Sequence, residues 1–367
     1  MTTVATPPTV PLPSAPGPAP AKKRRGSNSV LGRYLIIRFL LIFPTIFILV
    51  TMVFMLMRIT GDPLTVALGG KLPPDQLAER IHQAGYDRPI LVQYFEYLGH
   101  IFTGNFGTSV TDGQPISQIL LTHGSATLEL SFYALIVAFI IGIPLGQVAA
   151  YFRDRWPDAI LRIFAILAYA TPVFFAGLLL KLVFAVWLDV LPVAGRASTR
   201  TEILFASLPN RTGIYVIDAF RTGNPDVIGD VLSHAVLPGV ALGLLTAGIF
   251  LRLVRTNVIG TLGRDYVDAA RSRGVREIRL VRKHAWKPAL IPIITVIGLQ
   301  IAVLLGGAVL TETTFEWKGL GFELAYYLSK RDFVAVQGIV ALLAVIVALT
   351  NFIVDIIAAL IDPRVRY

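Results

Sequence analysis

The sequence predicts an all-α polytopic membrane protein with six transmembrane helices, and three observations support this fold class. Of the 367 residues, 54% are hydrophobic and only 15% are charged, whereas soluble proteins carry about 25% charged residues. The apolar residues form six runs long enough to cross a bilayer as helices. The runs lack the alternation that β-barrel strands require, so helices are expected.

The six expected spans follow from the apolar runs in chain order. The fourth run is the weakest, because His234 and Arg252 lie close to its two ends. Prolines inside a span or near its end favour kinks, and Pro172 in the third run is one of them. The expected spans are 34–57, 126–152, 159–188, 236–251, 289–310 and 334–361.

The segments around the spans give the expected domain organisation. Residues 1–28 are predicted to be a disordered cytoplasmic tail, since seven of the first twenty residues are Pro. The first transmembrane helix, assigned to 29–57, is too long for a cleaved signal core and is expected to be retained. We expect an extracytoplasmic loop or cap at 58–125, a five-helix core at 126–361 and a cytoplasmic tail at 362–367.

The distribution of Lys and Arg predicts the orientation, because cytoplasmic loops are enriched in them. Residues 252–287 hold ten basic and three acidic residues. By contrast, residues 58–125 hold four basic and six acidic residues, and 189–235 hold four and five. We therefore expect a multi-pass protein of the cytoplasmic membrane with both termini in the cytoplasm. This topology accounts for the net charge of +10, so nucleic acid is not an expected partner.

The cytoplasmic segment 252–288 is too patterned for a simple turn. Asp265 is expected to cap a short helix that runs through Arg273, and Gly274 to end this helix in the left-handed conformation. A second helical piece is expected to follow. One face of that piece comprises Ile278, Val281 and Ala285.

Three interpretations of this basic segment compete. It is a basic amphipathic loop resting on anionic lipid, a calmodulin-like target, or a rigid projection that docks into a groove of a cytoplasmic partner. Ala269 and Ala270 favour docking, because small side chains let a helix backbone approach another surface closely.

Several motifs carry a resemblance to a known family. Asp268-Ala269-Ala270 followed by Gly274 resembles the EAA loop of ABC importer permeases, with Asp where the general pattern has Glu. Over residues 30–367 the chain resembles the first permease of the dipeptide, oligopeptide and nickel ABC importer family. Its other motifs include Thr60-Gly61-Asp62-Pro63, Asn105-Phe106-Gly107-Thr108-Ser109, Ala126-Thr127-Leu128-Glu129-Leu130, Trp317-Lys318-Gly319-Leu320-Gly321 and Asp362-Pro363-Arg364.

The resemblance implies a type I ABC importer permease fold with a coupling helix that docks into an ATPase subunit. The implied partners are a second homologous permease, two ATPase subunits or domains, an extracytoplasmic substrate-binding protein and membrane lipid. ATP and Mg would be bound by the ATPase subunits, so this chain is expected to bind no cofactor and to be a transporter subunit, not an enzyme. The residues implied in ATPase coupling are Asp268, Ala269, Ala270, Arg271, Ser272, Arg273, Gly274 and Arg276.

The function implied by the resemblance is a permease subunit that moves short peptides across the cytoplasmic membrane by alternating access. Nickel chelates, glutathione and haem are alternative substrates within the same family. An ion-coupled secondary transporter is the alternative from another class, and a membrane-embedded enzyme is the third. Lipid phosphate binding competes with ATPase contact as the role of Arg271, Arg273 and Arg276.

The sequence lacks the motifs of several chemistries. Gly69-Gly70-Lys71 is followed by Leu72, so it is not a phosphate-binding loop. The sequence has no H-E-x-x-H or G-x-S-x-G motif, no Cys and only five scattered His residues. We therefore expect no catalytic residue and no metal site.

Polar residues within the expected spans are candidates for function. For Glu129, Lys181 and Asp355, helix pairing or an interfacial role is favoured over substrate contact. The resemblance places the fifth span beside the passage, and the residues expected to line it are Thr295, Gln300 and Gly306.

The loop 58–125 is long enough for a folded cap. It is expected either to dock a binding protein or to form a packed lid without a partner of its own. The residues expected to share one apolar face of its short helices are Leu77, Ile81, Leu91, Tyr94 and Phe95.

Overall fold

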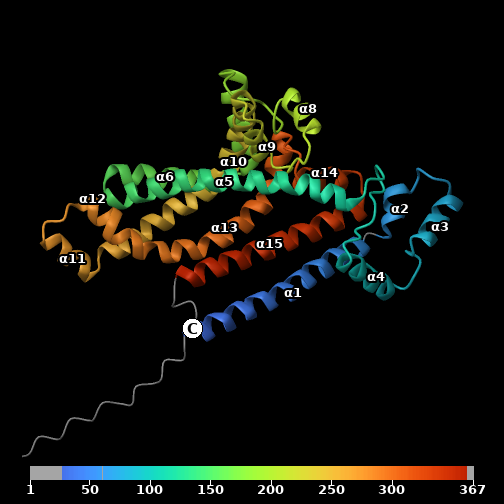
Figure 1. The fold of residues 1–367 in the computed structure, drawn as a ribbon, viewed down its shortest axis with the longest axis horizontal. Helices are drawn as coiled ribbons and strands as arrows, with labels where there is room; N and C mark the ends of the chain where they lie inside the picture. The colour runs from blue at the N-terminus through green and yellow to red at the C-terminus, as the bar shows by residue number, and fades with distance from the viewer. Residues whose placement is uncertain (1–26, 60, 362–367) are drawn as a thin grey trace, which may run out of the picture.

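The computed structural model describes residues 27–59 and 61–361 of the chain (Figure 1). Within these ranges every named element is a helix, and one isolated bridge pairs Thr108 with Pro115. Residues 1–26 and 362–367, on which nearly all of the two predicted tails fall, lie outside the described residues.

Four unbroken helices are long and apolar enough to cross a membrane. Three of them exceed the expected spans by several residues: α1 begins earlier, α5 continues into the preceding loop, and α10 extends at both ends. The four are α1 (Ser27–Ile59), α5 (Ile116–Tyr151), α10 (Pro225–Leu262) and α15 (Phe333–Ile361). They confirm the all-α polytopic fold class.

The third expected span is a bent pair and not one straight helix. Helix α6 (Trp156–Ala170) and helix α7 (Val173–Leu180), which continues as a π-helix η1 (Lys181–Trp187), meet at 106°. Thr171 between them is extended, with φ −75° and ψ 125°. Pro172 explains the break, since proline disfavours the helical conformation in the residue before it and provides no N–H.

The fifth expected span is also bent. Helix α13 (Trp286–Phe315) contains Pro292, and the helical segments on its two sides differ in direction by 53°. If each bent pair counts as one span, the described chain has the six spans that the hydropathy predicts.

Small residues allow α5 and α10 to pack closely at the centre of the molecule. A Cβ atom on Gly146 would lie 2.6 Å from Val254 Cβ, and one on Gly142 would lie 2.7 Å from the Ala247 carbonyl oxygen. Such glycines let helices approach each other in a membrane, where van der Waals contact contributes much of the association. The α5–α10 pair therefore forms the centre around which the other helices pack.

Shorter helices lie at the two ends of the long ones (Figure 1). Helix α11 (Asp265–Ser272) and helix α12 (Glu277–Arg279) lie at one end. At the opposite end lie α2 (Pro63–Leu68), α3 (Pro74–Gln83) and α4 (Ile90–Phe102). The remaining short helices are α8 (Thr199–Ser207), α9 (Tyr215–Thr222) and α14 (Leu320–Ser329).

The apolar face predicted for the 58–125 loop is wrong in part. Tyr94 is buried and its ring packs 5.3 Å from that of Phe54 on α1. Leu91 and Phe95, on the same helix α4, are 64% and 67% exposed. The helix therefore docks on α1 through Tyr94 and Tyr97 and presents Leu91 and Phe95 outward, as an amphipathic helix does.

Candidate functional site

The candidate coupling segment begins with helix α11, which the local sequence favours. Asp265 and Asp268 lie in its first turn, where carboxylates are stabilised by the positive end of the helix dipole. Asp265 is not the cap that the sequence predicts, because Arg264 occupies the N-cap position and makes no side-chain capping bond. Asp265 is instead the first residue within the helix.

Gly274 ends this helical segment as the sequence predicts. Its φ is +79°, in the left-handed region, and its amide donates to the Arg271 carbonyl oxygen at 2.9 Å. No atom lies within 4 Å of the position that a Cβ atom would occupy. The turn is therefore open to the surroundings of the molecule.

Helix α11 has one face packed on the chain's own core. Val267 and Ala270 are 0% and 1% exposed, and they belong to one buried cluster with Val254 and Val258 of α10 and Ile293 of α13. The same cluster includes Ala285, which directly precedes α13. Ala270 therefore packs against this chain, while its neighbour Ala269 is exposed.

The opposite face of the segment is exposed and charged. Arg271 pairs with Asp268 on its own helix and with Glu277 of α12, where its Nε donates at 2.6 Å. The hydrogen bond to Glu277 is the main cause that raises the pKa of Arg271 above its usual value. Arg273 Nε donates to the Ala269 carbonyl oxygen at 3.2 Å, and we find no ion pair of Arg276 among the described residues.

The structure thus brings the predicted coupling residues together on one projection. All of them except Ala270 are exposed. We call this surface the α11 surface, and its exposed residues are Asp268, Ala269, Arg271, Ser272, Arg273, Gly274 and Arg276.

The face predicted for the second helical piece is partly wrong. Val281 and Ala285 are buried, but Ile278 is 42% exposed and Leu280 is buried in its place. The segment 280–285 is a π-helix, η2 (Leu280–Ala285), and its wider turn shifts which side chains share a face. A periodicity of 3.6 residues does not predict this shift.

The residues expected to line a passage have different surroundings. Gln300 is 7% exposed, and its Oε1 atom has no hydrogen-bond partner among the described residues. Gly306 is exposed, and a Cβ atom there would meet nothing within 4 Å. The side chain of Thr295 lies outside what the structure describes.

The ionisable residues of the spans pair with other parts of the chain. Glu129 accepts hydrogen bonds from Arg196 and from the Val216 amide at 2.8 Å. Lys181 Nζ donates to the Thr314 carbonyl oxygen at 2.9 Å, and Asp355 lies 3.4 Å from Arg38. These contacts agree with the helix-pairing interpretation of the three residues.

Four buried carboxylates among the described residues were not singled out from the sequence: Asp158, Asp218, Glu312 and Asp332. Asp158 is 0% exposed and accepts two hydrogen bonds from Arg255, at 2.6 and 2.7 Å. Glu312, also 0% exposed, accepts from Thr127 Oγ1 at 2.7 Å and from the Phe322 amide at 2.9 Å. A charged residue next to an apolar run was the available signal of a buried carboxylate. The sequence does not reveal Arg255 and Thr127 as partners, because they lie far away along the chain.

The helices and the α11 surface define a polytopic membrane protein with a charged projection at one end, and the comparisons specify its class. Residues 142–367 match the family described as "Binding-protein-dependent transport system inner membrane component". Residues 31–127 match the corresponding N-terminal family, "Binding-prot-dependent transport system membrane comp, N-term". The chain belongs to this family of transport-system membrane components.

Several relatives of known name cover most of the chain. The di/tripeptide transport system permease protein of Pseudomonas aeruginosa is 38% identical, covering 89% of this chain and 96% of that protein. The probable D,D-dipeptide permease protein of Escherichia coli is 39% identical, with coverages of 84% and 89%. The glutathione permease protein of Salmonella typhi is 32% identical, with coverages of 91% and 99%.

A solved structure of the MetNI methionine ABC transporter, in an inward-facing conformation, also resembles the chain. It is 17% identical with a TM-score of 0.49, and the match covers 68% of this chain and 98% of that chain.

Proposed function

We propose that this protein is the permease subunit of an ATP-driven ABC importer that moves short peptides across the cytoplasmic membrane. The observation that carries the proposal is the α11 surface, which is exposed on one side and packed on the helix core on the other. The peptide permeases among the relatives support the substrate class. Glutathione, itself a tripeptide, is the second candidate substrate because of the glutathione permease relative.

The α11 surface is the proposed docking site for a separate ATPase subunit. The exposed Ala269 and the open turn at Gly274 let a partner approach the backbone, while the charged residues around them supply directed contacts. Arg271 is already held by Asp268 and Glu277. Its role is therefore to fix the shape of the projection, which leaves Arg273 and Arg276 as the arginines for partner contact.

Buried contacts supply the route by which docking would act on the passage. Val267 and Ala270 of α11 share a cluster with Val254 of α10 and Ile293 of α13. When two ATPase subunits close on ATP and Mg, the pull on α11 reaches both long helices through this cluster. In the proposed alternating-access cycle, this movement opens the passage outward, and ATP hydrolysis resets it.

The proposed assembly contains a second homologous permease, two ATPase subunits or domains and an extracytoplasmic substrate-binding protein. The chain itself binds no nucleotide in this scheme. Large exposed apolar side chains on α1, such as Ile36, Phe43 and Ile48, form the proposed contact with membrane lipid. The proposed orientation places both termini and the α11 surface in the cytoplasm.

Substitution of Gly274 tests the docking proposal. Gly274→Asp is expected to reduce ATPase co-purification and ATP-driven uptake of a dipeptide by at least about tenfold, which corresponds to about 1.4 kcal/mol of binding free energy. Gly223→Asp is the matched control, because Gly223 has a φ of +65° and equally open surroundings but lies outside the α11 surface. Full uptake by Gly274→Asp at normal membrane levels would show that this surface does not couple transport to ATP.

A second measurement separates the proposal from an ion-coupled transporter. The purified chain in ATP-free vesicles is expected to show no dipeptide uptake when a proton gradient is imposed. Uptake driven by the gradient alone would favour the ion-coupled class.

A further inference from the structure

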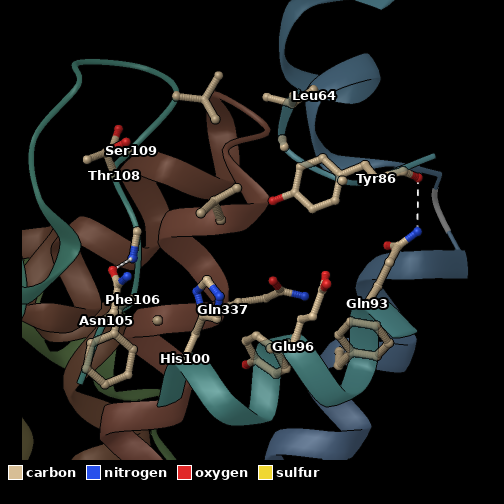
Figure 2. Close-up of a pocket in the computed structure, with 18 of the residues that line it drawn as sticks. Leu64, Tyr86, Gln93, Glu96, His100, Asn105, Phe106, Thr108, Ser109 and Gln337 are labelled. Carbon is tan, nitrogen blue, oxygen red and sulfur yellow. Dashed lines mark hydrogen bonds between the residues drawn. The ribbon is translucent and has the colours of Figure 1, made fainter. Parts of the chain in front are cut away.

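A cavity of about 520 Å³ lies at the end of the bundle opposite the α11 surface. Its walls come from the end of α1, from α2, from the end of α3 and the turn after it, from α4 and the loop that follows it, and from the start of α15 (Figure 2). This volume falls within the range of about 300–1,000 Å³ that is typical of small-molecule sites. None of the residues proposed for coupling or for the passage lines it.

Several buried donors in the wall of this cavity have no hydrogen-bond partner among the described residues. They are Nε and Nη1 of Arg58, the hydroxyl of Tyr97 and Nε2 of Gln337. Gln337 is 6% exposed, and Figure 2 shows its side chain extending from α15 into the cavity toward Glu96 of α4. Unpaired buried donors are costly in a folded protein, so this cluster is expected to bind an acceptor.

The charge of the cavity favours an anion as that acceptor. The Arg58 guanidinium lies 5.0 Å from the ring of Phe54 and 4.7 Å from that of Tyr86. Among the described residues no carboxylate lies within ion-pair distance of it. Glu96, the acidic residue in the wall, is already paired with Arg88. Asp62 acts on the guanidinium only from beyond ion-pair distance and Tyr86 is uncharged, so no carboxylate of the described residues neutralises it directly.

We propose that this cavity binds a small organic molecule through a carboxylate or phosphate group held by Arg58, Tyr97 and Gln337. A planar guanidinium with two unpartnered nitrogen atoms is suited to such an oxyanion, because charge-assisted hydrogen bonds are the strongest ones. Gln93 adds a free acceptor, since its Nε2 donates to two backbone carbonyls and its Oε1 is unpartnered. A ligand with an N–H or O–H group near its oxyanion can accept from the free donors of the cavity and donate to the Gln93 Oε1 atom.

Two sources present this chemistry at the proposed outer surface. One is a dissolved small acid such as a short peptide, and the other is the headgroup of an anionic lipid. The exposed apolar side chains of α4 place the cavity near the bilayer surface, within reach of both.

The experiment uses the full-length chain with its co-purifying subunits, delipidated in maltoside micelles, and measures binding by calorimetry. Each oxyanion probe is paired with a counterpart that lacks the oxyanion: dialanine with dialanine amide, and dihexanoyl-phosphatidylglycerol with dihexanoylglycerol. One oxyanion probe is expected to bind at least about tenfold more tightly than its counterpart. Dialanine as the binder identifies a dissolved acid, and phosphatidylglycerol identifies a lipid headgroup.

Substitutions assign this binding to the cavity. Arg58→Gln is expected to weaken the bound probe at least about tenfold, whereas Arg200→Gln, at an exposed arginine outside the cavity, leaves it unchanged. If Arg58→Gln does not assemble, Gln337→Met decides, with an expected loss of about threefold or more. The proposal is overturned if neither oxyanion probe binds, if the counterpart without the oxyanion binds equally well, or if the deciding variant binds as the unaltered chain does.

Discussion

Ala269 and Ala270 are neighbours with opposite surroundings, although the sequence presents them as one motif. Ala269 is exposed on the α11 surface, while Ala270 is 1% exposed within the core cluster. The sequence suggests that both keep a helix surface narrow for a partner. The structure shows that only Ala269 is available for that role, because Ala270 is buried where α11 packs closely on its own chain.

This difference predicts different consequences for the same substitution at the two positions. Ala269→Glu is expected to leave the amount of protein in the membrane unchanged and to reduce ATPase co-purification. Ala270→Glu is expected to lower the membrane amount itself, because a carboxylate would be buried without a partner in an apolar cluster. Immunoblots of membranes and pull-downs of the ATPase measure the two effects, and equal membrane levels for both variants would contradict this account.

Single residues also show what sequence reasoning does and does not reach. Gly274 was predictable, because a glycine that follows a short helix in this position is typical of a left-handed end. The buried pair of Glu129 and Arg196 was not predictable, because 67 positions separate its members and no periodicity relates them. Such pairs form only when the tertiary fold brings distant segments together, so local sequence patterns do not reveal them.

At the scale of elements, the hydropathy predicted where helices lie but not how they bend or turn. Thr171-Pro172 breaks the third span by 106°, and Pro172 was the available signal. The π-helix η2 carries no comparable signal in the sequence, because no proline or glycine lies within it. It removes Ile278 from the buried face that an α-helix would give it.

The contact of α5 with α10 gives a prediction about helix packing. Gly146→Ala is expected to destabilise the protein by about 1–3 kcal/mol, because the new Cβ would lie 2.6 Å from Val254 Cβ and 2.8 Å from the Leu251 carbonyl oxygen. Gly260→Ala, at an open position of α10, is expected to be neutral or slightly stabilising, since Ala has the higher helix propensity. Thermal unfolding in detergent measures both, and equal midpoints would rule out tight packing at Gly146.

At the scale of the whole molecule, the elements divide between two ends. Helices α11 and α12 lie at one end of the long helices and α2 to α4 at the other (Figure 1). The excess of Lys and Arg predicts that the α11 end faces the cytoplasm. The all-α class followed from the composition and from the length and pattern of the apolar runs, whereas the cavity beside Arg58 depends on residues from several separate segments and had no sequence signal.

The absence of cysteine from the sequence makes the orientation directly measurable. Arg153→Cys, in the exposed turn between α5 and α6, is expected to react with a membrane-impermeant maleimide only after permeabilisation. Ser207→Cys, exposed at the end of α8, is expected to react in intact spheroplasts. The reverse labelling pattern would invert the proposed topology.

The buried cluster under α11 has a mechanical consequence for the whole bundle. Val267 and Ala270 interlock with α10 and α13, and close-packed side chains resist compression. The α11 surface is therefore rigidly attached to the helix core. A displacement of α11 is expected to tilt α10 and α13 together.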